Sequence, residues 1–93
     1  MELEGKTILI SGAGPGLGGA CAAAALRDGA NVIATARNLD RLQGAVAELD
    51  PGGERTLAMA ADIMDSDALA AAVSAGVERF GGLDGVVNVA AYD

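Results

Sequence analysis

The residues of this chain best suited to chemistry are glycines at alternate positions, which directly follow a short apolar run at residues 7–10. These glycines are Gly12, Gly14, Gly16 and Gly18. An Ala- and Leu-rich stretch comes next, so the glycine segment leads into a predicted helix whose free N–H groups point back at it. Because such a helix start attracts anions, the pattern predicts a cradle for the phosphates of a dinucleotide.

Three of the glycines have distinct mechanical roles in this prediction. Gly12 allows a tight exit from the strand, Gly16 lets a pyrophosphate approach the backbone, and Gly18 brings the helix close to the sheet. Gly14, Gly16 and Gly19 also satisfy G-x-G-x-x-G, but that register starts farther from the strand. The register that begins at Gly12 is therefore preferred.

Two alternatives explain the same glycines differently. Gly14 and Gly19 have the spacing of a nucleotide-hydrolase phosphate loop, but Ala20 stands where that loop requires lysine. The segment could also be a plain glycine-rich turn, which the strand before it and the helix after it disfavour. Cys21 follows in an alanine-rich stretch with no nearby base, which indicates a small buried thiol rather than a nucleophile.

Length and composition narrow the remaining possibilities. The chain has 93 residues, of which 52% are hydrophobic and 2% aromatic, so we expect one small domain whose interior is built from Ala, Val, Leu and Ile. Its net charge of −7 argues against nucleic acid and anionic membrane surfaces as partners. One cysteine and no histidine predict neither a disulfide nor a metal site. No signal peptide or membrane-spanning stretch is visible, so we expect a cytoplasmic protein.

Strand and helix patterns alternate along the chain. Expected strands span 7–10, 31–35, 56–60 and 85–88, and expected helices span 17–28, 39–49 and about 66–80, the last starting at Asp65 or Ser66. Asn38 can cap the second helix. Two apolar stripes are expected to face the sheet, one formed by Leu39, Leu42, Val46 and Leu49, the other by Leu69, Val73, Val77 and Phe80.

This alternation predicts an α/β fold of Rossmann type, a doubly wound parallel sheet with helices on both faces and strand order 3-2-1-4. We expect residues 1–93 to form one unit without an internal boundary. Val86, Val87 and Val89 are typical of a strand covered on both faces. No further element of the chain remains to cover that strand, so we expect part of the domain to be missing.

Three motifs together resemble the short-chain dehydrogenase/reductase family. Ser11-Gly12-x-x-x-Gly16-x-Gly18 is similar to the family's Thr-Gly-x-x-x-Gly-x-Gly fingerprint, and Asp62-Ile63 is similar to its Asp-Val/Leu pair. Residues 88–91 resemble its Asn-Asn-Ala-Gly element, although Val89 replaces the second Asn and Ala91 the Gly. The resemblance covers essentially the whole chain, which corresponds to the N-terminal part of a family member.

The resemblance implies roles for individual residues at a dinucleotide site. Leu17, at the predicted helix start, belongs with the glycines that contact the cofactor. Asp62 would accept a hydrogen bond from the adenine amino group, and Ile63 would pack against the adenine ring. Asn88 would tie neighbouring strands together, and the Ala90 backbone would lie near the nicotinamide ribose.

The end of the second strand bears on which nicotinamide cofactor is preferred. Ala36 takes the place where NAD-preferring members carry Asp, and Arg37 follows, as in members that prefer NADP. A guanidinium can make charge-assisted contacts to a 2′-phosphate. We therefore expect NADP(H) to be preferred and NAD(H) to remain possible, with a solvated Arg37 as the alternative.

Family members transfer hydride between the nicotinamide and an alcohol or carbonyl substrate, using a Ser and a Tyr-x-x-x-Lys motif. In this sequence the only tyrosine is Tyr92 and the only lysine is Lys6, so we assign no catalytic residue. We expect the chain to be the cofactor-binding portion of an oxidoreductase that, when intact, could form homo-oligomers. The alternative is a non-catalytic nucleotide-binding or partner-binding module, for example one that pairs its fourth strand with another chain.

Overall fold

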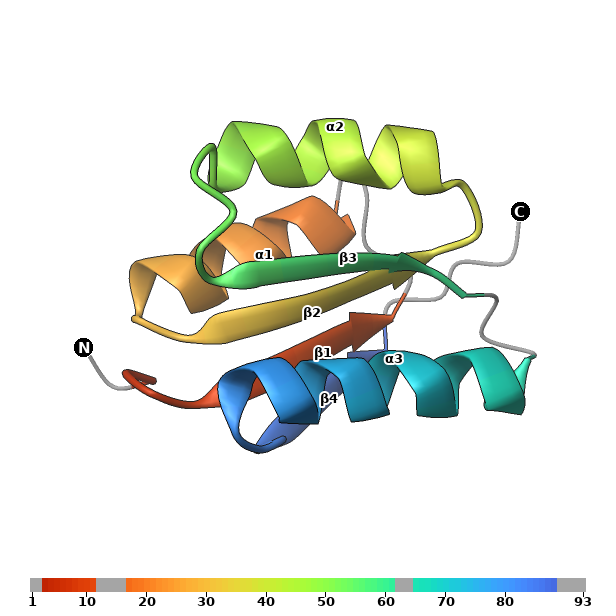
Figure 1. Cartoon of the computed structure of the whole chain (residues 1–93). Helices are drawn as coiled ribbons and strands as arrows, with labels where there is room; N and C mark the ends of the chain where they lie inside the picture. Colours follow the sequence, from red (N-terminus) through yellow and green to blue (C-terminus); the bar gives the residue numbers. More distant parts are fainter. Residues whose placement is uncertain (1–2, 12–16, 62–64, 89–93) are drawn as a thin grey trace.

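Strands and helices alternate along the whole described chain (Figure 1). The structure is a computed structural model and describes residues 3–11, 17–61 and 65–88. In chain order the elements are β1 Thr7–Ser11, α1 Leu17–Arg27, β2 Asn31–Ala36, α2 Leu39–Leu49, β3 Thr56–Ala60, α3 Ser66–Phe80 and β4 Gly85–Asn88. Every expected element is present, and the bounds differ from those expected by at most one residue.

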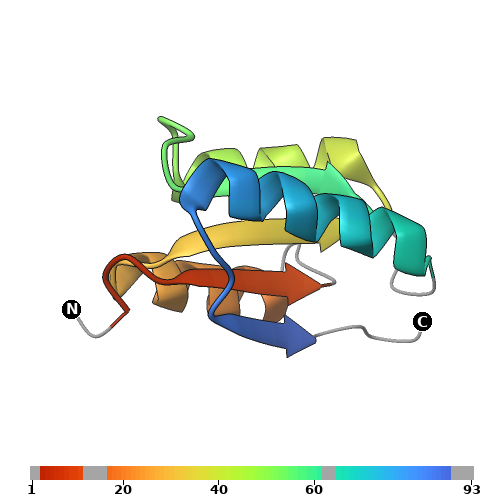
Figure 2. The same cartoon turned by 60° about the horizontal axis from the view of Figure 1, so that its bottom comes forward.

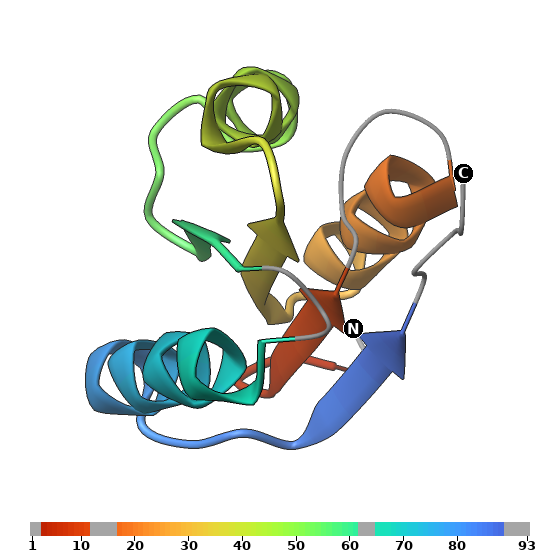
Figure 3. The ribbon, with the colours of Figure 1, turned by 90° about the vertical axis from the view of Figure 1, so that its right-hand side faces the viewer.

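The strands form one parallel sheet in the order β3-β2-β1-β4, which confirms the predicted topology. Helices α1 and α2 lie on one face of the sheet and α3 lies on the other (Figure 3). In the pairing register, Ser11 of β1 stands level with Thr35 of β2 and with Asn88 of β4. The two strands beside β1 therefore end close to its own last residue.

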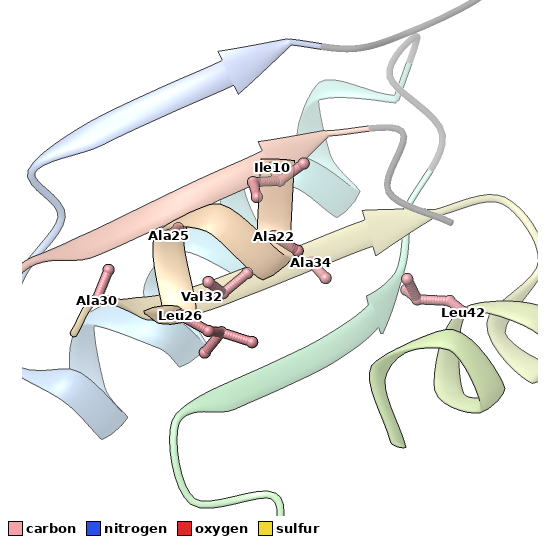
Figure 4. Close-up of a cluster of buried hydrophobic side chains, with 8 residues drawn as sticks. All are labelled: Ile10, Ala22, Ala25, Leu26, Ala30, Val32, Ala34 and Leu42. Carbon is pink, nitrogen blue, oxygen red and sulfur yellow. The ribbon is translucent and has the colours of Figure 1, made fainter. Parts of the chain in front are cut away.

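Alternation along the strands divides the core between the two faces. Ile10, Val32 and Ala34 pack with α1 and with Leu42 of α2 (Figure 4). Leu9 and Ile33, which point the other way, pack with α3. Small side chains dominate the contact with α1, where Ala22, Ala25, Leu26 and Ala30 are buried. The core is thus filled without large aromatic side chains, because the helix packs close to the sheet.

Most residues of the two expected apolar stripes pack against the core, but the stripes are only partly buried. In α2, Leu42 is buried but Leu49 is 37% exposed. In α3, the buried residues are Ala72 and Gly76, whereas Val77 is 37% exposed. The helix lies so close to β2 that only small residues fit at the contact, and the larger ones flank it. No helix in the described part of the chain combines the length and apolar character needed to cross a membrane.

Strand β4 is less covered than its sequence indicates. It lies at the edge of the sheet beside β1 (Figure 2). Val86 is 60% exposed and Val87 36% exposed, one on each face of the sheet. An interior strand is covered on both faces, but within the described ranges neither face of β4 is. The valine side chains of this strand are therefore left partly exposed to solvent.

Hydrogen bonds to backbone carbonyls tie the elements together at the end of the sheet where the strands begin. Arg79, in the last turn of α3, donates to the carbonyl oxygens of Thr56, at 2.8 Å, and of Gly53. Its guanidinium also lies over the Phe80 ring, 5.1 Å from the centroid. Arg55 donates to the carbonyl oxygen of Leu26 at 2.8 Å. These bonds fix the ends of α1 and α3 against the start of β3.

The contact between α3 and β2 leads to a stability prediction. A Cβ added at Gly76 would overlap the side chain of Ile33, whereas a Cβ at Gly44 in α2 would meet nothing within 4 Å. We expect Gly76→Ala to lower the free energy of unfolding by about 1–3 kcal/mol through overpacking. Gly44→Ala, the matched control, should raise it by up to about 1 kcal/mol because alanine favours a helix interior. Urea unfolding measures both, and equal effects would contradict the close packing.

The carbonyl contacts of Arg79 lead to a second prediction. We expect Arg79→Ala to lower the free energy of unfolding by about 1–2 kcal/mol, because hydrogen bonds from a charged donor are lost at a partly exposed site. Arg27→Ala provides the control, since Arg27 is an exposed residue in the last turn of α1. Thermal unfolding of the two variants should separate them, and equal melting temperatures would rule out a stabilising role for the Arg79 bonds.

Candidate functional site

The candidate site lies at the edge of the sheet where the parallel strands end. All three helices start at this edge, so their N-terminal amides gather there (Figure 3). From β1 the chain continues to β2 on one side, and from β3 it crosses to β4 on the other side. Ligands of open parallel sheets bind at such a reversal of strand order, beyond the carboxyl ends of the strands. The position between β1 and β4 therefore marks the centre of the candidate site.

The glycine segment joins β1 to α1 at this edge. Strand β1 ends at Ser11, immediately before Gly12, and α1 starts at Leu17, immediately after Gly16. Gly18 belongs to the first turn of α1. The strand and helix that the phosphate prediction requires are thus confirmed. Gly12 and Gly16 lie outside the described residues, and phosphate contacts by any of these residues stay a prediction.

The remaining residues implied by the family resemblance belong to two other strand ends. Asn88 is the last residue of β4 and pairs in register with Ser11, so its backbone stands beside the end of β1. Asp62, Ile63 and Ala90 lie outside the described residues. Asp62 follows Ala61, whose backbone N–H donates to the carbonyl oxygen of Ala36 at 2.9 Å. The adenine and nicotinamide roles of these residues stay predictions.

Arg37 lines a pocket beside the end of β2. It is an exposed residue directly after β2, and together with Asn38, Leu39 and Asp40 it lines a shallow pocket that is open to solvent. Asn38 caps α2 as expected, because its side-chain oxygen accepts a hydrogen bond from the Arg41 backbone N–H at 3.1 Å. The pocket therefore opens beside a guanidinium and the positive end of a helix.

The charges around this pocket do not all favour an anion. The N-terminus of α2 and the Arg37 side chain both attract negative charge. Asp40, in the first turn of α2, carries the opposite charge into the same lining. Sequence reasoning did not include Asp40 in the site, although an acidic residue two positions after a helix cap is a recognisable signal. The pocket lining thus combines one cation, one anion and the positive end of a helix.

Groups for acid–base or nucleophilic chemistry are not brought together in the described part of the chain. Cys21 is half-buried and packs against the core between α1 and the sheet, so it is less enclosed than predicted. No group of three or more His, Cys, Asp or Glu side chains that could hold a metal occurs among the described residues. Tyr92 lies outside them, and Lys6 is exposed just before β1.

Comparison with known proteins agrees with this arrangement. The short chain dehydrogenase family model matches residues 6–93. Hydroxysteroid dehydrogenase-like protein 2 of Danio rerio is 40% identical over 94% of this chain and 23% of its own length. A short chain dehydrogenase/reductase of Colletotrichum higginsianum is 43% identical over 96% of this chain and 33% of its own length.

A solved structure shares the fold as well as the sequence. The short-chain dehydrogenase/reductase (glucose/ribitol dehydrogenase) of Brucella melitensis superposes with a TM-score of 0.91 at 32% identity, over 100% of this chain and 39% of that one. This chain thus spans well under half the length of the relatives that it matches. The family match across the glycine segment, the sheet and the three helices shows that the chain belongs to the short-chain dehydrogenase family.

Proposed function

We propose that this chain is the dinucleotide-binding part of an NADP(H)-dependent oxidoreductase that transfers hydride between the nicotinamide and an alcohol or carbonyl substrate. The observation that carries the proposal is the position of β1 and α1. Ser11 ends the strand and Leu17 starts the helix at the carboxyl edge of the sheet, and Ser11 is level with Asn88 of β4. Family membership supports the reaction type.

The proposed cofactor extends across the strand ends on both sides of the glycine segment. Its pyrophosphate binds at the N-terminus of α1, where free amides and the helix dipole favour negative charge. The adenosine half extends toward the ends of β2 and β3, where Arg37, Asp62 and Ile63 hold it. The nicotinamide half extends toward β4, with Asn88 and Ala90 beside it. In this arrangement the chain binds and orients the cofactor.

The preference for NADP(H) rests on the end of β2. Ala36 offers no carboxylate to a ribose 2′-hydroxyl, and Arg37 follows it at the rim of the pocket. A guanidinium presents several N–H donors in a plane and is matched to phosphate oxygens. Arg55 and Arg79 are bonded to backbone carbonyls at the opposite end of the sheet. Of the chain's arginines, all of which lie in the described ranges, Arg37 is the one that lines this pocket, so it is the cation proposed to bind the 2′-phosphate.

Proton transfer is assigned to residues that the 93-residue sequence does not contain. A hydride reaction of this type needs a group that gives a proton to the carbonyl oxygen or takes one from the alcohol. Tyr92 and Lys6, the chain's only Tyr and Lys, do not form the family's Tyr-x-x-x-Lys motif. We therefore propose that the 93 residues bind the cofactor without turning over substrate. We also propose that the intact protein acts in the cytoplasm.

A second candidate function is a non-catalytic module that binds a nucleotide or a partner chain. The 60% exposure of Val86 on the edge strand β4 favours it, since an uncovered strand edge can pair with another polypeptide. Sequencing the coding DNA beyond Asp93 distinguishes the two candidates. An oxidoreductase requires an in-frame segment with Tyr-x-x-x-Lys, whereas a stop codon directly after Asp93 would favour the module.

The cofactor assignment is tested by titrating NADPH and NADH into the chain and into two arginine variants, with reduced-nicotinamide fluorescence as the signal. We expect Arg37→Ala to weaken NADPH binding by about 10- to 100-fold, because hydrogen bonds to a charged group are worth about 1.5–3 kcal/mol. NADH binding should change by less than about twofold, since NADH lacks the 2′-phosphate.

Arg41→Ala is the matched control for this titration. It removes the same charge from α2 at a residue that is not among those lining the pocket. Its NADPH affinity should stay within about twofold of the unmodified chain, because Arg41 is exposed and does not line the pocket. Equal losses for NADPH and NADH in Arg37→Ala, or equal losses in both variants, would overturn the assignment of Arg37.

A further inference from the structure

An acidic side chain lies in the pocket to which the 2′-phosphate of the cofactor is assigned. Asp40 lines this pocket together with Arg37, Asn38 and Leu39. Among the described residues of the lining, Arg37 and Asp40 are the two that carry charge, and both are exposed. The pocket therefore presents a guanidinium and a carboxylate to the same ligand, and the carboxylate opposes an anion.

The position of Asp40 in α2 accounts for an acid at this place. Helix α2 begins at Leu39, directly after its cap Asn38, so Asp40 is the second residue of the first turn. A negative charge there interacts favourably with the positive end of the helix dipole. Asp40 therefore stabilises the start of α2 whether or not a ligand is bound, although the same charge disfavours an anion in the pocket.

We propose that Asp40 limits the preference of this site for NADP(H) over NAD(H), because its carboxylate repels the 2′-phosphate that Arg37 binds. The two cofactors share a pyrophosphate and differ in the 2′-phosphate, a monoester that carries about 1.5 to 2 negative charges at neutral pH. The charge of Asp40 therefore acts more strongly on NADP(H) than on NAD(H). This role as a specificity-determining residue rests on the proposed function.

Exposure to solvent sets the size of the expected effect. Asp40 is exposed and the pocket is open, and an exposed pair of charges changes an equilibrium constant by up to about fivefold. Salt weakens the interaction further, because its range is about 10 Å at 0.1 M ionic strength and about 3 Å at 1 M. The repulsion by Asp40 should therefore be measurable at the lower ionic strength and disappear at the higher one.

Titration of NADPH and NADH into Asp40→Asn tests this role, with reduced-nicotinamide fluorescence as the signal. Asparagine keeps the size of the side chain and removes its charge. At about 0.1 M ionic strength we expect NADPH to bind about threefold to fivefold more tightly than to the unmodified chain, and NADH affinity to change by less than about twofold. At about 1 M the gain for NADPH should be lost.

Three results of this titration would overturn the proposal. The first is an equal gain in affinity for NADPH and NADH. The second is a gain for NADPH that persists at high salt, because screened repulsion cannot explain it. The third is weaker binding of NADPH or NADH by Asp40→Asn, because the carboxylate would then assist the cofactor rather than oppose it.

Glu48→Gln is the matched control, because it makes the same change in net charge on the same helix. Glu48 is exposed near the end of α2, eight residues after Asp40 and thus about 12 Å farther along the helix axis, and it is not among the residues that line the pocket. Its NADPH affinity should stay within about 1.5-fold of the unmodified chain at 0.1 M ionic strength. Equal gains in Glu48→Gln and Asp40→Asn would contradict a local role for Asp40, since the net charge of −7 alone would then account for both.

A double variant tests whether Arg37 and Asp40 act on the same phosphate group. Arg37→Ala removes the cation that is proposed to hold the 2′-phosphate in the pocket. Adding Asp40→Asn to Arg37→Ala should therefore raise NADPH affinity by less than about twofold, so the effects of the two substitutions are not additive. A gain as large as that of Asp40→Asn alone would show that Asp40 does not act on the phosphate bound by Arg37.

Thermal unfolding without ligand measures the role of Asp40 in α2. We expect Asp40→Asn to lower the melting temperature by about 1–5 °C, because a favourable charge is lost from the start of the helix. Glu48→Gln should not lower it, since a negative charge near the C-terminal end of a helix is unfavourable. An unchanged or higher melting temperature in Asp40→Asn would contradict the stabilising role, and this measurement does not depend on the proposed function.

The outcomes separate this inference from the proposed function. If the unmodified chain binds neither NADPH nor NADH, the proposed function fails and the specificity role of Asp40 fails with it. If the unmodified chain binds NADPH and Arg37→Ala weakens it selectively, the proposed function stands. In that case, an unchanged ratio of NADPH to NADH affinity in Asp40→Asn overturns the role of Asp40 alone.

Discussion

The pairing of β1 with β2 on one side and β4 on the other is the constraint on which the rest of this structure depends. Because all three strands run in the same direction, their last residues stand together at one edge. The end of β1, the start of α2 and the end of β4 lie at that edge although they are far apart in sequence. Burial of β1 between two helical layers keeps this arrangement in place.

The two ends of the sheet have different tasks. Where the strands begin, Arg55 and Arg79 donate hydrogen bonds to backbone carbonyl oxygens. Asp84 accepts a hydrogen bond from the Thr7 backbone N–H at 2.8 Å. Where the strands end, Arg37 faces a pocket. The proposed anion site is compatible with the chain's net charge of −7, because helix N-termini and the Arg37 guanidinium act over short distances.

Much of the fold could be predicted from the sequence, because strand and helix periodicities and the turn residues agree along the chain. The caps Asn38 and Asp65 were visible as well. The depth of burial could not be predicted from the sequence. A helical stripe shows which side faces the sheet, but the close contact through Gly76 depends on Ile33, more than 40 residues away in sequence. The level position of Ser11 and Asn88 could not be predicted either, because only the register between β1 and β4 sets it.

The uncovered strand β4 also affects how this chain behaves at high concentration. An edge strand with exposed valines on both faces can add to the same strand of another molecule, whereas a net charge of −7 keeps molecules apart. Salt shortens the range of that repulsion to about 10 Å at 0.1 M ionic strength. We therefore expect added salt to favour association of the isolated chain through this edge.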